Sequence, residues 1–373
     1  MSEILIAGGG LAGGLAALRL ARAGREVTLI ERSAGPHHKV CGEFLSGEAL
    51  AELEAVGLDP AALGAAPLTQ VRLAGTGRTA EAALPFRALS LTRRALDEAL
   101  LAMVAEAGAE VRRGVGVAGV EGGEGGWRLR LTGDETVSAR TFLAATGKHD
   151  LRGRARPPGT HDDLVGLKAY YRPAPDAARA LGASVELIFF PGGYCGVQPV
   201  EGGLVNACLV VSQARLSALG GPWAVFGAMI ADCPRAALLL GGAERMTQKP
   251  LAVAKVPYGY VRTRTNGPYH LGDQAAVIPS FCGEGMGLAL RSGRLAAEAV
   301  LAGESAAAFQ RRFARLAYIR VKSTAFLSRA LAVPVLRGAA LGVALRAPGL
   351  LTTLAAATRT PDGRAQPPAV SSA

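Results

Sequence analysis

The stretch EILIAGGGLAGGLAALRLARAGREVTLIE, residues 3–31, decides the fold of the first part of the chain. Its apolar run at residues 3–7 is typical of a buried parallel strand, and apolar residues at helical spacing follow over residues 11–23. A second short apolar run covers residues 27–30. A strand, a helix and a second strand within about thirty residues predict a βαβ unit.

A glycine-rich turn lies between the first strand and the helix, and it has the spacing GxGxxG. Gly8 permits a tight turn, Gly10 lets a pyrophosphate approach the backbone, and Gly13 allows close packing of the helix on the strand. The first helical residues, Leu11 and Ala12, offer free N–H groups and a partial positive charge to phosphates. These residues predict the phosphate-binding part of a dinucleotide site.

Glu31 ends the second strand and lies 18 residues after Gly13. A carboxylate at this place can accept hydrogen bonds from both ribose hydroxyls of an adenosine. The strand, the helix and the acid together favour a dinucleotide, but they do not distinguish FAD from NAD.

A second glycine-rich segment, GDQAAVIPSFCGEGMGLALRSG at residues 272–293, follows a short strand some 240 residues further along the chain. Its Asp273 can accept hydrogen bonds from ribityl or ribose hydroxyls. A reduced flavin carries negative charge on its pyrimidine ring, and the dipole of the helix that starts near residue 285 stabilises such a charge. The candidate cofactor contacts in this segment are Gly272, Asp273, Pro279, Gly283, Glu284, Gly285 and Met286.

The chain resembles the geranylgeranyl reductase family, inside the wider class of para-hydroxybenzoate-hydroxylase-like flavoproteins. The resemblance covers about residues 1–302 and rests on residues 7–24, on Glu31-Arg32, on LTRRALDEAL at 91–100 and on residues 272–293. The GEG at 283–285 is closer to the reductases than to the aromatic hydroxylases. The resemblance implies an FAD-dependent oxidoreductase, with Arg32 and Arg93 among the FAD contacts.

The segment KVCGEFLS, residues 39–46, lies beside the flavin ring in the resembled family. This placement implies that Cys41 and Gly42 contact the flavin, and it makes Cys41 the candidate catalytic residue. A thiol there would tune the flavin or protonate a substrate carbanion; the alternative is a small packed residue. A redox pair between Cys41 and Cys282 is a further alternative, for which the sequence gives no distance.

Two segments depart from the resembled patterns. In ATGKHDLRG at 145–153, Thr146 and Gly147 keep a turn beside the cofactor but lack the acid that the hydroxylases carry there, which puts the usual NAD(P)H contact in question. In place of the aromatic-rich motif of the reductases stands FFPGGYCGVQPV at 189–200, so the wall of the substrate site differs. Because only one GxGxxG is present, NAD(P)H is expected as a transient electron donor.

These patterns predict an α/β protein with a Rossmann-like FAD-binding domain, a β-sheet substrate domain and a C-terminal helical segment. Within it we expect a helix at 91–108, a strand at 111–120 and a helical stretch at 222–240. Pro334 and Pro348 are expected to break the helical segment. The predicted boundaries are 1–70, 88–160 and 256–304 for the FAD-binding domain, 71–87 and 161–255 for the substrate domain, 305–360 for the helical cap and 361–373 for a disordered tail.

The basic residues of the chain gather near the C-terminus. Between Ser305 and Pro361 there are nine Lys and Arg and no Asp or Glu, so this segment holds nine of the eleven net positive charges and leaves +2 for the rest. Such a segment predicts an anionic partner, and its apolar runs favour peripheral contact with an anionic membrane. The alternative is a solvated helical cap with snorkelling arginines, since Arg329, Arg337 and Arg346 do not share one helical face.

Several classes of protein and of site are disfavoured. Aromatic residues make up only 5% of the chain, which argues against a base-stacking platform for nucleic acid. The five cysteines are odd in number and form no CxxC pair, so neither a disulfide framework nor a zinc ribbon is expected. The His37-His38 pair, His149 and the polar residues at 161–163 lack the spacing of metal ligands, and we predict no metal site.

No targeting or membrane-spanning segment is expected. The N-terminus lacks a basic region before its apolar run, and no uncharged apolar run reaches the ~20 residues of a spanning helix. We expect a cytoplasmic protein that acts on a lipophilic small molecule, with the oligomeric state left open.

Three hypotheses about function compete. The first is a flavin monooxygenase that hydroxylates a lipophilic aromatic or polyketide-type molecule of secondary metabolism, because short flavoproteins with the KVCGEFLS loop resemble tailoring enzymes of that kind. The second is a reductase of a double bond in an isoprenoid or other lipophilic substrate, with an acid such as Cys41 supplying the proton. The third is a flavin-bound scaffold at a membrane. The sequence favours the monooxygenase slightly over the reductase.

Overall fold

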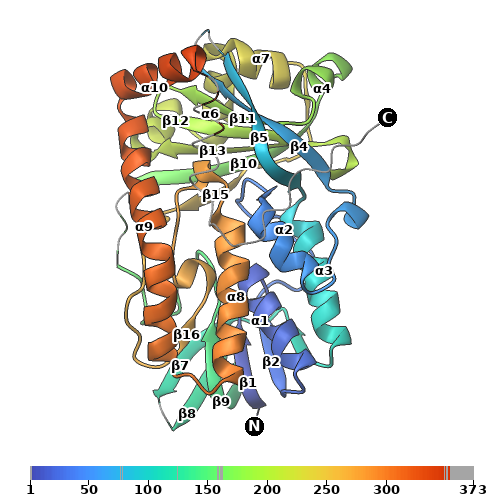
Figure 1. The fold of residues 1–373 in the computed structure, drawn as a ribbon, viewed down its shortest axis with the longest axis vertical. Coiled ribbons are helices and arrows are strands. Elements are labelled where there is room, and N and C mark those ends of the chain that lie inside the picture. Colours follow the sequence, from blue (N-terminus) through green and yellow to red (C-terminus); the bar gives the residue numbers. More distant parts are fainter. Residues whose placement is uncertain are drawn as a thin grey trace.

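The computed structural model describes residues 2–347 except 76, 78, 124, 158 and 160–162, and it also describes residues 349 and 352. Two β-sheets lie at opposite ends of the long axis in Figure 1, and the helix α9 (Ala306–Ala332) runs along one side of the molecule. This arrangement confirms the predicted fold class: an α/β protein with a Rossmann-like domain, a β-sheet domain and a C-terminal helical segment.

The first sheet has the strand order β6-β2-β1-β9-β8-β7, with β16 beside β9. Its central strands are parallel, and β7 and β8 extend it as antiparallel strands. The central strands can be apolar throughout because both of their faces are covered. The strands are β1 (Ser2–Ala7), β2 (Val27–Glu31), β6 (Glu110–Arg113), β7 (Val117–Gly123), β8 (Gly126–Leu131), β9 (Thr136–Ala144) and β16 (Tyr269–His270).

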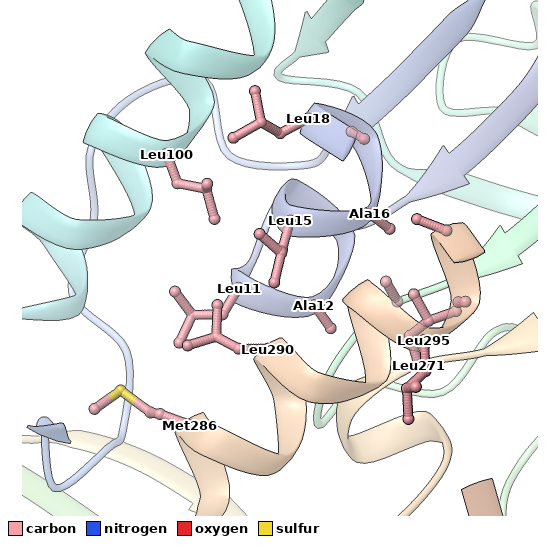
Figure 2. Close-up of a cluster of buried hydrophobic side chains, with 14 of the residues drawn as sticks. Leu11, Ala12, Leu15, Ala16, Leu18, Leu100, Leu271, Met286, Leu290 and Leu295 are labelled. Atoms are coloured by element: carbon pink, nitrogen blue, oxygen red, sulfur yellow. The ribbon is translucent and has the colours of Figure 1, made fainter. Parts of the chain in front are cut away.

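Three helices pack together beside the first sheet: α1 (Leu11–Arg22), α3 (Arg93–Glu106) and α8 (Gly285–Leu301). In Figure 2, Leu11 of α1 lies beside Leu290 and Met286 of α8. On the neighbouring side of α1, Leu15 and Leu18 face α3. This core brings the start of α8 next to the start of α1, although the two segments lie far apart in the sequence.

The second sheet has the order β14-β10-β13-β12-β11-β4-β5-β3, with β15 paired to β10. Its apolar face packs against the helices α6 (Pro222–Asp232) and α7 (Pro234–Leu240). The strands are β3 (Phe44–Leu45), β4 (Ala66–Ala74), β5 (Thr79–Ser90), β10 (Leu164–Arg172), β11 (Ser184–Phe190), β12 (Gly193–Pro199), β13 (Val205–Ser212), β14 (Glu244–Arg245) and β15 (Leu251–Ala254). The other helices are α2 (Gly47–Glu54), α4 (Pro175–Leu181), α5 (Gln213–Leu219) and the short 3₁₀ helices η1 (Ala61–Leu63), η2 (Glu201–Gly203), η3 (Gly272–Gln274) and η4 (Ser280–Cys282).

Three details differ from the sequence-based expectations. The early part of the second sheet is longer than the expected residues 71–87. It covers residues 66–90, where β4 and β5 pair with each other, and β3 pairs with β5. The expected strand at 111–120 is two strands, since the chain turns at Gly114, whose φ is +74°. The expected helix at 222–240 is bent by 117° between α6 and α7, where Pro234 starts the second helix.

The C-terminal segment consists of α9 and α10 (Pro334–Arg346), so the predicted break at Pro334 is confirmed. The predicted break at Pro348 and the tail at 361–373 lie outside the described residues. Among the described residues, no single helix has the length and apolar composition to cross a membrane, and only the bent pair α6 and α7 meets that test when taken together.

Candidate active site

The turn between β1 and α1 requires glycine at two positions. Gly8 has a φ of +110°, and a Cβ on it would lie 2.3 Å from the carbonyl oxygen of Ala145. A Cβ on Gly13 would lie 1.9 Å from the carbonyl oxygen of Gly8. Both positions therefore exclude a side chain, for the reasons of turn geometry and close packing that the motif predicts.

Two cations lie beside Gly10. A Cβ on Gly10 would meet Arg93 Nη2 at 3.3 Å and Lys39 Nζ at 3.7 Å. The helix α1 starts there with no side-chain cap and no acidic residue in its first turn, so its N–H groups stay available. Free N–H groups and two cations at one place fit a diphosphate.

Asp97 holds these two cations in place. Its Oδ1 accepts from Arg93 Nε at 2.7 Å, and its Oδ2 accepts from Arg93 Nη2 at 2.9 Å and from Lys39 Nζ at 2.7 Å. Burial raises the pKa of the Asp97 carboxyl, but the two cations outweigh burial and keep that pKa below its ordinary value. One carboxylate facing two cations leaves one positive charge unbalanced beside Gly10.

Glu31 lies at the other side of the same turn. Its Oε2 accepts from the N–H of Gly9 and its Oε1 from the N–H of Ser33, both at 2.9 Å. Burial raises the pKa of Glu31, but these two N–H groups and Lys39 lower it overall, so the side chain is a carboxylate at neutral pH. Each oxygen keeps a lone pair for a further donor, as a ribose contact requires.

The second glycine-rich segment packs directly on α1. Gly272 has a φ of +56°, and a Cβ on it would lie 3.2 Å from Ala12 Cβ. A Cβ on Gly293 would lie 2.3 Å from the carbonyl oxygen of Ala12, so α8 crosses α1 at this point without a side chain between them. The start of α8 at Gly285 has open space above it and no side-chain cap. Asp273 lies on η3 in the same region and is partly exposed.

The remaining sequence-predicted residues have contacts of several kinds. Thr146 and Gly147 form the turn after β9: the Thr146 hydroxyl donates to the carbonyl of His149 at 2.6 Å, and Gly147 has a φ of +64°. Arg32 makes a hydrogen bond of 2.8 Å to the ring of His149. Residues that pack in or against the protein interior are Pro279, Gly283, Glu284 and Met286. Their role as cofactor contacts stays a prediction.

The loop that carries Cys41 and Gly42 is tied to the second sheet. Asn206 of β13 donates from Nδ2 to the carbonyl oxygens of Cys41 at 3.2 Å and of Gly42 at 2.8 Å. The N–H of Glu43 donates to Cys41 Sγ at 3.4 Å. Arg93 also interacts with the Cys41 sulfur, so the thiol lies beside the cation that borders Gly10.

Glu43 is the most constrained residue of this loop. It is fully buried and has a φ of +63°, a left-handed conformation that non-glycine residues rarely adopt. Its carboxylate pairs with Lys168 Nζ at 2.6 Å and accepts from the Tyr170 hydroxyl at 2.7 and 2.9 Å and from the N–H of Arg93 at 2.8 Å. Burial raises the pKa of Glu43, and these partners oppose the rise.

Lys168, Tyr170, Tyr194, Asn206 and Cys208 form one face of the second sheet, which we call the inner wall. Their neighbours along the strands, such as Leu167 and Cys195, pack with α6 and α7 on the opposite face. Lys168 lies opposite Cys208, and Tyr170 lies opposite Asn206, in the register of β10 and β13.

The hydroxyl and thiol groups of the inner wall near the Lys168–Glu43 ion pair are uncharged. Burial raises the pKa of Cys208 to about 11, and it raises the pKa of Tyr194 well above its ordinary value, so both stay protonated at neutral pH. The Tyr194 hydroxyl hydrogen-bonds to Ser280 Oγ at 2.5 Å, and the Tyr258 hydroxyl donates to the same oxygen at 3.3 Å. Cys41, Tyr194 and Cys208 keep partial exposure, which leaves this wall accessible.

Comparison with known proteins decides the family. The profile of the family described as "FAD binding domain" matches residues 1–212, more than half of the chain. This protein belongs to that family of flavoproteins. It is an FAD-dependent oxidoreductase, as the resemblance implies.

Curated relatives of this flavoprotein are named as reductases. The menaquinone reductase of Mycolicibacterium smegmatis is 26% identical over 321 residues, which cover 81% of this chain and 77% of the relative. The digeranylgeranylglycerophospholipid reductase 2 of Methanopyrus kandleri is 29% identical over 333 residues, which cover 83% of this chain and 81% of the relative. The relation to the geranylgeranyl reductase family is thereby confirmed.

Solved structures share the fold of this flavoprotein. The halogenase PltM has a TM-score of 0.75 at 16% identity, with 88% of this chain and 76% of that chain covered. A flavoprotein/dehydrogenase from Cytophaga hutchinsonii has a TM-score of 0.70 at 20% identity, with 82% and 79% covered. At these identities the likeness concerns the fold alone.

FAD fits the residues that are present. Gly10 lies at the uncapped start of helix α1 and has Arg93 and Lys39 beside it, and a diphosphate needs such N–H groups and cations. Glu31 and the first turn of α8 would receive the ribose and the flavin end, respectively. Among the described residues, no group of three or more His, Cys, Asp and Glu could hold a metal ion. His161 and Asp162 lie outside the described residues.

Sequence reasoning missed residues on both sides of the Cys41 loop. Asp97 follows Arg93 by four residues on α3. This spacing predicts an ion pair between the two side chains, so the sequence could have identified Asp97. Lys39 precedes Cys41 by two residues, but its direction toward Gly10 is visible only in the fold. Glu43 contacts residues on β10, more than a hundred positions away in the sequence, and no local pattern predicts that contact.

Proposed function

We propose that this flavoprotein reduces a carbon–carbon double bond of a lipophilic substrate, with Cys41 as the proton donor. The observation that carries the proposal is the placement of Cys41. Its loop is tied to β13 through Asn206 and to β10 through the pair of Glu43 with Lys168, while Cys41 keeps partial exposure beside the inner wall. A group that must deliver a proton to one carbon needs such a fixed position.

Reduced FAD, when bound, would supply the hydride that adds to one carbon of the double bond. The thiol of Cys41 would give its proton to the other carbon as the hydride adds: the S–H bond breaks and a C–H bond forms, so one hydrogen comes from the flavin and one from the thiol. The sulfur is left as a thiolate, which the neighbouring Arg93 stabilises. A proton from water restores the thiol.

The inner wall supports a lipophilic substrate. The five residues of the inner wall carry one charge, on Lys168, which the buried Glu43 carboxylate balances, and the Tyr194 hydroxyl and the Cys208 thiol are protonated at neutral pH. When an apolar chain binds against an uncharged wall, the free-energy cost of removing water from that wall is small. The two relatives bear names of lipophilic molecules, menaquinone and a digeranylgeranyl glycerophospholipid, which supports the same class.

The monooxygenase that the sequence favours stays a prediction. The described contacts of the inner wall do not favour oxygen insertion over hydrogen addition. The curated relatives are named as reductases, which favours hydrogen addition. We also expect NAD(P)H to reduce the flavin in a transient encounter. Mixing the oxidised flavoprotein with NADH, NADPH or dithionite and following the loss of flavin colour would test this donor.

Product mass tests the reaction. The FAD-loaded chain, reduced with dithionite under nitrogen in D₂O, would be incubated with digeranylgeranylglycerophospholipid, whose reducible groups are carbon–carbon double bonds. We expect the probe to gain two deuterium atoms on carbon, because the reduced flavin takes its transferable hydrogen from the solvent and the Cys41 thiol exchanges with it. A product that gains an oxygen atom, and only in air, would contradict the proposal.

Two variants test the role of Cys41. Cys41→Ser should lower the rate of product formation by about 10²-fold, because a hydroxyl is a far weaker acid, and should leave the FAD content unchanged. Cys208→Ala is the matched control, since it removes a thiol from the same wall and should keep most of the activity. Equal loss in both variants would argue against Cys41 as the donor.

A further inference from the structure

The outer face of α9 carries a stripe of exposed side chains. They recur at spacings of three and four residues, and so they share one face of the helix. The stripe consists of Arg311, Arg315, Tyr318, Lys322, Phe326 and Arg329. Phe309, Phe313 and Ala317 lie on the opposite face of α9 and are buried. Arg311, Arg315, Lys322 and Arg329 therefore align on one face of α9.

The outer face of α9 is apolar as well as basic. Phe326 is 76% exposed and Ile319, beside the stripe, is 77% exposed. These are large side chains with most of their surface in contact with solvent, although helix α9 is otherwise well packed. An exposed apolar patch next to basic residues is typical of an interaction site.

The helix α10 continues the apolar surface. Val335 is 79% exposed, Leu336 is 50% exposed and Val343 is 52% exposed. In Figure 1, α10 lies at the end of α9 and at the margin of the molecule, over one end of the second sheet. We call the exposed side chains of these two successive helices together the α9–α10 face.

Cations on this face lack acidic neighbours in the sequence. No Asp or Glu occurs between residues 305 and 361. Within the described part of the chain, Arg311 and Arg315 form no ion pair, whereas Arg312, off the stripe, pairs with Glu304. Lys322 donates to the carbonyl of Gly259 at 2.9 Å, which fixes its ammonium at the edge of the stripe. The face has a positive potential that nothing within its own helices offsets.

We propose that the α9–α10 face docks on an anionic phospholipid bilayer. Phosphate headgroups match the cations, and the boundary of the acyl chains receives Ile319, Phe326 and Val335, as in other interfacial amphipathic helices. A second copy of this chain suits the face less well, because a two-fold contact would bring two arginine stripes together. A nucleic acid would pair with the cations and leave the apolar side chains uncovered. Docking concerns the surface of the chain and is independent of the reaction it catalyses.

Vesicle flotation with the full FAD-loaded chain tests the docking. Vesicles of phosphatidylcholine with 30 mol% phosphatidylglycerol would be compared with pure phosphatidylcholine, at about 0.05 and 0.5 M salt, because salt screens the attraction. We expect binding to the anionic vesicles that is at least tenfold weaker at the higher salt concentration. Equal binding to both vesicle types, or none to either, would overturn the proposal.

Variants locate the contact. Arg311→Glu with Arg315→Glu should weaken vesicle binding at least tenfold, and Phe326→Asp should weaken it by a similar factor. Leu63→Asp is the control for the apolar change, because Leu63 is exposed on η1 and outside both helices; Arg179→Glu on α4 is the control for the charge change. Both controls should bind as the wild type does. A sedimentation measurement that shows a dimer dissociated by Phe326→Asp, together with no vesicle binding, would instead assign the face to self-association.

Discussion

Glu43 and Lys168 form an ion pair of 2.6 Å in which neither side chain is exposed. Lys168 belongs to β10 of the second sheet, and Glu43 belongs to the loop that carries Cys41 beside the cofactor residues. The pair therefore joins the two halves of the site through a contact that excludes water. Tyr170 and the N–H of Arg93 complete the coordination of the carboxylate.

This geometry predicts how the pair responds to substitution. Lys168→Met leaves the Glu43 carboxylate buried without its cation, and we expect the free energy of unfolding to fall by about 3–5 kcal/mol. Adding Glu43→Gln removes the stranded charge and should recover most of that loss. Urea titration of the FAD-loaded proteins measures both values. If the free energy of unfolding of Lys168→Met lies within about 1 kcal/mol of the wild-type value, the result would contradict a buried, charged pair.

The second prediction concerns the diphosphate. Lys39→Met removes one of the two cations that border Gly10, and a charge-assisted hydrogen bond contributes about 1.5–3 kcal/mol. We expect the Kd for FAD to rise about tenfold or more, and the dependence of that Kd on salt to decrease. Arg94→Met is the matched control, since Arg94 is exposed next to Arg93, and it should leave the Kd unchanged. Equal effects of the two changes would place the diphosphate elsewhere.

Glu31 gives the third prediction. Glu31→Ala removes an acceptor for two ribose hydroxyls and should weaken FAD binding more than tenfold, at ~1.5–3 kcal/mol for each charge-assisted bond. The fold should persist, because the hydrogen bonds described for this carboxylate are two, from the N–H groups of Gly9 and Ser33. Flavin absorbance after extensive dialysis provides the measurement. Retention of stoichiometric flavin would refute the assignment of Glu31.

The fourth prediction is a loss of stability in acid through His270. Burial, reinforced by Arg262, Arg154 and Arg156, lowers the pKa of His270 to about 3. Since the unfolded chain titrates near pH 6.5, it gains the proton first, and stability falls as the pH drops from about 6.5 toward 3. We expect the unfolding free energy to be ~2 kcal/mol lower at pH 5 than at pH 7.5 from this group alone. His270→Gln should flatten that part of the pH profile, and an unchanged slope would exclude His270 as its source.

The sequence predicted the elements whose signals are local. The βαβ unit at 3–31, the helix expected at 91–108 and the start of α8 near residue 285 all follow from short patterns, and the structure has each of them, with α3 at Arg93–Glu106. Their physical basis is the need for glycine at Gly8 and Gly13, together with helix capping, which depend on neighbours in sequence.

Contacts between distant strands were not predictable in this way. The partners of Glu43 lie on β10, and Asn206 reaches the Cys41 loop from β13. Which face of a buried strand turns toward the cofactor depends on strand register, and a one-residue shift would exchange Lys168 for Leu167. The bend between α6 and α7 likewise depends on Pro234 and on packing against the second sheet.

Hydrogen addition to a double bond is the central claim, and a single-turnover measurement tests it most directly. The FAD-loaded chain would be reduced, mixed in a stopped-flow instrument with digeranylgeranylglycerophospholipid under nitrogen, and followed by flavin absorbance. The account predicts that the flavin reoxidises without oxygen, at a rate that increases with probe concentration and falls about 10²-fold in Cys41→Ser. A flavin that stays reduced until oxygen is admitted, and then yields an oxygenated probe, would contradict it.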